Sequence, residues 1–149
     1  MYLKHSVQFS ITLYHWIIFK STIRLYIYNI NLLGIIIDNK LTWKPHIANI
    51  RTKISKALGT LNKVKHNIPT KLKRQLYFSL IHPHLLYGVE LWGAAVKSHI
   101  QLIQILQKRA IRFITSSTYN SSTHNYFKDL KILKMQDLYQ VQLLTQMYV

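Results

Sequence analysis

The stretch WKPHIANIRTKISKALGTLNKVKH, residues 43–66, decides the fold because it has the pattern of one long amphipathic helix. At about 100° per residue, its apolar side chains, together with Ile68 just beyond the stretch, occupy roughly a third of the helix circumference. Lys56 and Lys63 fall on the opposite side, and Lys53 lies beside them. We therefore expect one face in a core and one cationic face. The apolar stripe consists of Ile47, Ile50, Ile54, Leu58, Leu61, Val64 and Ile68.

The positive charge of this region has no local counter-charge. Between Asp38 and Glu90 the sequence holds ten Lys or Arg and no carboxylate. A face that only keeps a helix soluble normally mixes both signs, because Glu–Lys pairs four residues apart stabilise it by about 0.2–0.5 kcal/mol. The whole chain has 20 Lys+Arg against 4 Asp+Glu, a formal charge of +16. This balance favours phosphate binding over simple solubility, with nucleic acid or an anionic membrane surface as the partner.

Length and composition set further limits. The 149 residues suit one domain, or one domain with an appendage. The absence of cysteine excludes disulfides and thiolate metal sites. The apolar run at residues 6–19 is shorter than the about 20 residues that span a bilayer. We expect neither a transmembrane helix nor a cleaved signal peptide.

The pattern predicts a mainly α fold with a short β-rich N-terminal segment. Residues 1–32 alternate in the manner of strands, and residues 33–37 form an apolar strand that ends in a turn at Asp38. In the long helix, Thr42 is the expected cap, Pro45 fits the first turn, and Gly59 suggests a close contact.

Further helical segments are expected. Thr70 is expected to cap a second helix that packs through Leu72, Leu76 and Leu80, and its short connection to the first helix predicts an antiparallel pair. A third helix spans about residues 98–115, and shorter ones follow a polar loop at residues 116–123. The last apolar stripe has no terminator, which predicts a truncated domain with a missing neighbouring surface.

Four strings of the sequence resemble, in order, the segment after the catalytic palm in reverse transcriptases of jockey-like non-LTR retrotransposons. The first is LGIIIDNKLTWKPHI at residues 33–47. The second is SLIHPHLLYG at residues 79–88, followed by ELWG at residues 90–93. LQKRAIRFIT at residues 106–115 and LKIL at residues 130–133 complete the set. Each string is weak alone, and the shared order over residues 33 to about 140 makes the resemblance strong.

The resemblance implies a division of the chain. Residues 1–32 stay unassigned, residues 33–41 correspond to a palm-derived strand near the primer grip, and residues 42–149 correspond to the helical thumb and its continuation. A thumb of this kind closes over template and growing strand. The implied partners are the RNA or DNA backbone and the missing palm and fingers, with no small-molecule substrate. An intracellular location is implied, nuclear if the protein acts with chromosomal DNA.

Catalytic residues are not expected in this chain. Nucleotidyl transfer needs two Mg²⁺ held by clustered carboxylates, and the palm of an intact parent carries an aromatic-x-Asp-Asp signature. Here no Asp-Asp pair exists, and the carboxylates are isolated in sequence. His82 and His84 do not share a helix face, so no metal site is expected either. We expect an inactive polymerase fragment without a cofactor of its own. The carboxylates are Asp38, Glu90, Asp129 and Asp137.

The candidate binding residues are basic side chains on the three main predicted helices. Those near the end of the third helix could instead serve the negative end of its dipole. Aromatic side chains could stack on bases, but packing is the expected role of Trp43, Tyr77, Tyr87 and Trp92. The predicted nucleic-acid-binding residues are Lys53, Lys56, Lys63, Lys71, Arg74, Lys108 and Arg112.

Two alternatives remain open at this point. A stand-alone basic helical nucleic-acid-binding module would need an exposed helix with base-reading Asn, Gln or Arg side chains. A membrane-surface protein would use its apolar start as an anchor and its cationic helices to meet anionic lipid.

Overall fold

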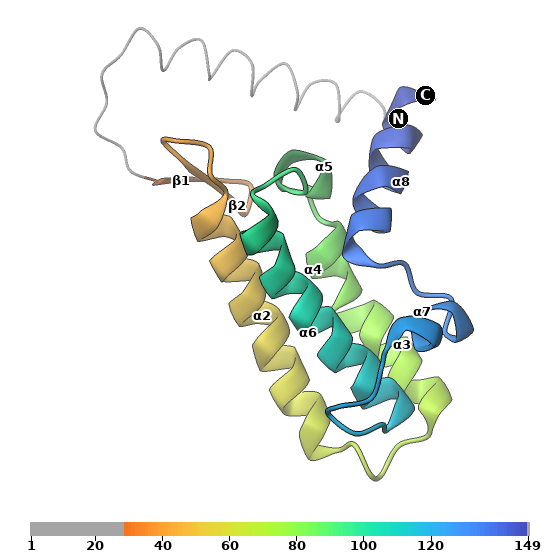
Figure 1. The fold of residues 1–149 in the computed structure, drawn as a ribbon. Coiled ribbons are helices and arrows are strands. Elements are labelled where there is room, and N and C mark those ends of the chain that lie inside the picture. Colours follow the sequence, from red (N-terminus) through yellow and green to blue (C-terminus); the bar gives the residue numbers. More distant parts are fainter. Residues whose placement is uncertain (1–28, 149) are drawn as a thin grey trace, which may run out of the picture.

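The computed structural model describes residues 29–148, which form a mainly α-helical fold with one β-hairpin (Figure 1). Strands β1 (Asn29–Leu32) and β2 (Ile35–Asp38) pair antiparallel, with Leu32 opposite Ile35. Leu33 and Gly34 form the turn and both have positive φ, as a type I′ turn requires. The strand predicted at residues 33–37 therefore begins two residues later, and the boundary expected at residue 32 falls at the hairpin turn. The other predicted N-terminal strands lie outside the described residues.

Helix α2 (Lys44–Lys63) is the predicted long helix. Its N-cap is Trp43, with φ 62°, rather than Thr42, whose hydroxyl accepts a hydrogen bond from the Lys44 N–H at 3.3 Å. Asp38 fixes this start, because its carboxylate accepts hydrogen bonds from both the Thr42 and Trp43 N–H groups. Pro45 lies in the first turn, as predicted.

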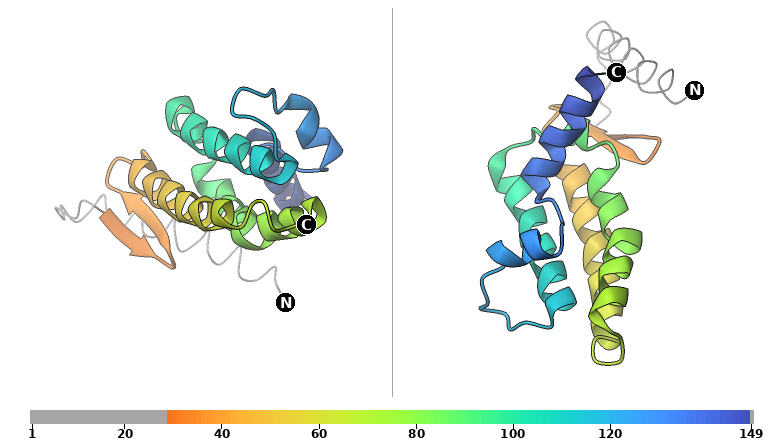
Figure 2. Two further views of the ribbon diagram at one scale, coloured as in Figure 1. Left: turned by 90° about the horizontal axis from the view of Figure 1, so that it is seen from below. Right: turned by 90° about the vertical axis from the view of Figure 1, so that its right-hand side faces the viewer.

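The chain changes direction twice, once after α2 and once before α6. Helices α3 (Thr70–Leu80), α4 (His82–Leu86) and α5 (Val89–Trp92) lead back to the hairpin end, and α6 (Lys97–Thr115) returns beside α2 (Figures 1 and 2). Helices α2 and α3 run in opposite directions, but α2 packs most extensively against α6. Thr70 is the first residue of α3 and Pro69 is its N-cap, so the predicted Thr70 cap is wrong.

Two further helices complete the described chain. After the polar loop, α7 (His124–Asp129) packs on α6, and α8 (Met135–Met147) packs against α5 and α6. Of the predicted last stripe, Leu138 is buried, whereas Val141 and Leu144 are exposed.

The core lies between α2, α3, α4 and α6 and continues under α8. The apolar stripe of α2 is buried from Ile47 to Leu61, as predicted, while Val64 is exposed beyond the helix end. The stripe predicted on α3 is only partly confirmed: Leu76 packs against the core, whereas Leu72 and Leu80 are exposed. Lys73 and Tyr77 face inward instead, because α6 covers that side of α3.

Candidate nucleic-acid interface

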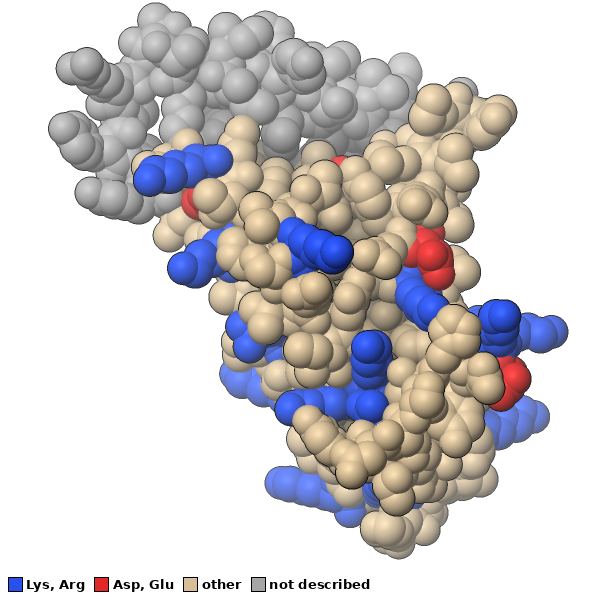
Figure 3. Space-filling view, in the orientation of Figure 1, with Lys and Arg blue, Asp and Glu red and all other residues tan. Residues whose placement is uncertain are grey.

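The exposed surface of α2 carries three lysines. Lys56 and Lys63 lie opposite the buried stripe, and Lys53 lies beside them, at the edge that faces α4. We call these residues the α2 cationic face. They are exposed because the apolar stripe fixes the orientation of the helix, as the helical period predicts. Figure 3 shows basic side chains along the side formed by α2 and across α6, with few acidic ones among them. This surface can attract phosphate groups along about the length of one helix.

The two predicted residues on α3 differ in availability. Lys71 is exposed in the first turn of the helix. Arg74 is half-buried: its Nε donates a hydrogen bond of 2.8 Å to the Leu130 carbonyl, and its guanidinium lies 4.8 Å from the centre of the Phe78 ring. Arg74 therefore joins α3 to the segment before α8, and only part of its charge faces solvent.

Lys108 and Arg112 lie in the second half of α6 and line a polar pocket of about 390 Å³. His124 and Lys134 line the same pocket, which α6, the polar loop, α7 and the start of α8 enclose. We call it the α6–α8 pocket. No sequence pattern signals this grouping, because Lys134 lies 26 positions after Lys108 in a different helical segment. The structure thus separates the predicted cations into two groups, one on α2 and α3 and one at this pocket.

Lys73 is a basic residue that serves the fold. Its side chain is 5% exposed, and its Nζ donates a hydrogen bond of 2.7 Å to Ser116 Oγ, beside the carboxyl end of α6. The ammonium group also lies 5.8 Å from the centre of the Phe113 ring. A cation at a helix carboxyl end stabilises the helix dipole, so Lys73 is not available to a ligand.

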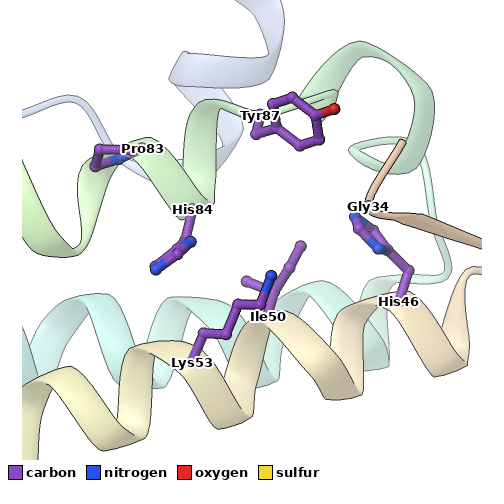
Figure 4. Close-up of a pocket in the computed structure, with 7 residues that line it drawn as sticks. All are labelled: Gly34, His46, Ile50, Lys53, Pro83, His84 and Tyr87. Atoms are coloured by element: carbon purple, nitrogen blue, oxygen red, sulfur yellow. The ribbon is translucent and has the colours of Figure 1, made fainter. Parts of the chain in front are cut away.

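A smaller pocket of about 300 Å³ lies between α2 and α4. Figure 4 shows Lys53 of α2 and His84 of α4 on opposite sides of it, with His46 near the hairpin turn. His46 is 2% exposed and its Nδ1 accepts a hydrogen bond of 3.2 Å from the Ile36 N–H, while its buried Nε2 has no hydrogen-bond partner among the described residues. No sequence pattern singles out His46, because its role depends on the contact with Ile36 of β2.

Burial favours the neutral form of the two histidines that line this pocket, His46 and His84. Burial, with a smaller contribution from the charge of Lys53, lowers the pKa of His46 to about 4. Burial and then Lys53 also lower the pKa of His84. Burial lowers the pKa of His82 as well, although His82 does not line the pocket. His46 and His84 therefore add hydrogen-bonding capacity to the pocket, and burial disfavours their charged forms.

The carboxylates do not converge on a metal site. Asp38 is 7% exposed and is occupied by hydrogen bonds from Thr42 and Trp43. Within residues 29–148, no group of three His, Cys, Asp or Glu side chains is close enough together to hold a metal ion. The donors present in this part of the chain do not fit the Mg²⁺ pair of a polymerase palm.

The aromatic side chains mostly pack. Tyr77 and Trp92 are completely buried, and Trp92 Nε1 donates a hydrogen bond of 3.0 Å to the Tyr87 carbonyl. Trp43 is half-buried against the core. Tyr87 is 53% exposed, although its hydroxyl donates to the Leu33 carbonyl. In the described residues, none of the helices combines the length and apolar character that crossing a bilayer requires.

These features define a helical module whose exposed cations are not balanced by acidic neighbours, which is the class of surface that binds polyanions. The chain is similar to three Drosophila melanogaster proteins. It is 35% identical over 121 residues to the RNA-directed DNA polymerase from mobile element jockey, covering 78% of this chain and 13% of that protein. The probable RNA-directed DNA polymerases from transposon BS and transposon X-element are 32% and 30% identical, each over 70% of this chain and 12% of the relative.

The chain is therefore related to the RNA-directed DNA polymerases of jockey-like non-LTR mobile elements, which confirms the resemblance inferred from the four strings. It spans only 12–13% of the length of these relatives. No protein-family model and no solved structure matches the chain.

Proposed function

We propose that the chain is the post-palm and thumb portion of a non-LTR reverse transcriptase, and that it holds the backbone of template and growing strand. The observation that carries this proposal is the α2 cationic face, an exposed row of lysines on a helix that is related in sequence to RNA-directed DNA polymerases. In this assignment β2 is the palm-derived strand beside the primer grip. Residues 42–149 form the thumb and its continuation.

The binding residues in this proposal are those with charge available to a ligand. Lys53, Lys56 and Lys63 form one row on α2, and Lys71 follows across the bend into α3. Lys108 and Arg112 act at the α6–α8 pocket. Arg74 contributes mainly through the fold, because its Nε is already bonded to the Leu130 carbonyl.

Nucleotidyl transfer is assigned to a different part of an intact parent polymerase. The described carboxylates of this chain are separated, and Asp38 is committed to the start of α2. The palm of the parent would supply both the paired aspartates and Mg²⁺, while this chain contributes binding alone.

The test is the salt dependence of binding to single-stranded RNA, measured by fluorescence anisotropy with the full chain. If about five phosphates are contacted, log K should fall with log[salt] at a slope of roughly −3.5. The triple variant K53Q/K56Q/K63Q should reduce the magnitude of this slope by about 2. The control K97Q/K128Q/K131Q removes the same charge from other exposed positions.

Equal slopes for the two triple variants, or a slope near zero for the unmodified chain, would contradict the proposal. A strong preference for one base sequence would favour the stand-alone binding module instead, since phosphate contacts carry no base information.

A further inference from the structure

A second concentration of positive charge surrounds the α6–α8 pocket. Lys108 and Arg112 line it from α6, and Lys134, the N-cap residue of α8, lines it from the chain segment that follows α7. Among the described residues that line it, none is Asp or Glu. Like charges gathered in a partly enclosed, polar space repel one another, and an anion between them would relieve that repulsion.

Arg112 is held in a fixed orientation at this pocket. Its Nε and Nη2 donate to the Ser121 carbonyl at 3.3 and 3.2 Å, and its guanidinium lies 5.6 Å from the centre of the Tyr119 ring. A guanidinium has five N–H donors, so these contacts leave Nη1 without a partner among the described residues. The side chain is thus prepositioned, which reduces the entropy lost when a ligand binds.

Lys134 is also held in place while keeping free donors. Its Nζ lies 3.3 Å from His124 Nδ1, within hydrogen-bond distance, and 6.0 Å from the centre of the Phe127 ring. An ammonium group has three donors, so two remain for a ligand.

Neutral polar groups complete the lining. Gln104, Asn120 and Ser122 can all donate hydrogen bonds, and the about 390 Å³ of the pocket exceeds what one tetrahedral oxyanion requires. A lining of donors without carboxylates suits a ligand that only accepts hydrogen bonds and carries negative charge.

We propose that the α6–α8 pocket binds a phosphate group, held by Lys108, Arg112 and Lys134. A phosphate offers acceptor oxygens to several donors at once, and charge-assisted bonds of this kind are the strong ones. The inference rests on the proposed function for the origin of that phosphate, which can belong to a nucleic-acid backbone, to a strand terminus or to a free phosphate.

The test is an NMR titration of the ¹⁵N-labelled full chain with inorganic phosphate, with chloride at matched ionic strength as the reference. We expect saturable shifts in residues 116–124 and around Lys134 with phosphate only. The variant K108Q/K134Q should raise the Kd for phosphate about tenfold or more, since losing about 1.4 kcal/mol of binding energy is a factor of ten. The control K128Q/K131Q, with the same loss of charge next to the pocket, should change Kd less than about twofold.

Phosphate shifts that match those of chloride, or equal Kd values for the two double variants, would overturn the proposal. Competition with two oligonucleotides of the same sequence, one with a 5′-phosphate and one with a 5′-hydroxyl, then identifies the source of the phosphate. If the 5′-phosphorylated strand displaces bound inorganic phosphate more strongly, the site takes a terminal phosphate. Equal displacement by the two strands indicates the backbone, and no displacement by either indicates a free phosphate. The pocket proposal and the proposed function fail separately, because the α2 triple variant tests RNA binding without altering this pocket.

Discussion

Gln107 Nε2 donates a hydrogen bond of 3.1 Å to the hydroxyl of Tyr77, which joins α6 to α3 inside the core. The same nitrogen donates to the Leu133 carbonyl at 2.8 Å, and Gln107 Oε1 accepts from the Met135 N–H at 3.0 Å. One buried amide therefore fixes three segments: α3, α6 and the start of α8. Burial raises the pKa of Tyr77 to about 12, although the bond from Gln107 opposes this rise, so the phenol stays protonated.

Replacing this amide should weaken the fold substantially. Gln107→Met keeps a similar length but leaves the Leu133 carbonyl and the Met135 N–H without their partner. Since an unsatisfied buried polar group costs about 1–3 kcal/mol, we expect a loss of about 2–4 kcal/mol. Chemical denaturation measures the effect. Gln101→Met, the same change at an exposed position of α6, should alter stability by less than about 0.5 kcal/mol, and equal losses would show that Gln107 has no special role.

Two glycines should respond to alanine in opposite directions. Gly88 has φ +62°, and a Cβ there would lie 2.6 Å from Ile35 Cδ1, so Gly88→Ala should cost about 2–4 kcal/mol. Gly59 is within α2 and an added Cβ meets nothing within 4 Å, so the close contact predicted from the sequence is absent among the described residues. Gly59→Ala should stabilise the protein by about 0.5–1 kcal/mol. Thermal unfolding distinguishes them, and a stabilising Gly88→Ala would contradict the described backbone.

His46 should make stability depend on pH between about 6.5 and 4. Its folded pKa is lowered to about 4 by burial, so in this range the unfolded chain binds a proton that the folded chain does not. The contribution of His46 to the free energy of unfolding is therefore fully present above pH 6.5, and it falls by up to about 3 kcal/mol as the pH drops to 4. His82 and His84 act in the same direction.

The measurement is denaturation at a series of pH values. His46→Gln removes one titrating group and should flatten the slope, while His66→Gln, at an exposed position, should leave it unchanged. A slope in the His46→Gln variant as steep as in the unmodified chain would rule out His46 as its source.

The ionised carboxylate of Asp38 should stabilise the fold at pH values above about 4. Burial raises the pKa of its carboxyl, but the hydrogen bonds from Thr42 and Trp43 outweigh burial and lower the pKa below 3.8. The stabilising contribution is present above about pH 4 and is lost as the pH falls through the lowered pKa. Asp38→Asn should cost about 1–3 kcal/mol at pH 7, because an amide nitrogen cannot accept these bonds.

The control for Asp38 is Asp129→Asn, which changes an exposed carboxylate at the end of α7. Circular dichroism during denaturation at pH 7 and pH 3 reports both variants. The difference between Asp38→Asn and the unmodified chain should shrink at pH 3, and a difference that grows there would contradict the lowered pKa.

Local patterns alone were enough to predict several features. The helical period of residues 43–66 oriented α2, because an apolar stripe of that width has to be buried, and the opposite lysines consequently became exposed. The helix ending at Thr115 and the relationship to jockey-like polymerases also follow from short strings of residues. These features depend on neighbours within a few turns of the chain.

Other features were decided only by tertiary packing. The regular spacing of Leu72, Leu76 and Leu80 predicted the inner face of α3. Of these only Leu76 packs against the core, because α6 lies over the side that carries Lys73 and Tyr77. Arg74 has the sequence surroundings of a free cation, yet the fold places Leu130, 56 positions away, against it. Lys134 joins Lys108 through the same kind of distant contact. Periodicity specifies that a helix has a buried side, but which of two half-apolar sides is buried depends on the partner that covers it.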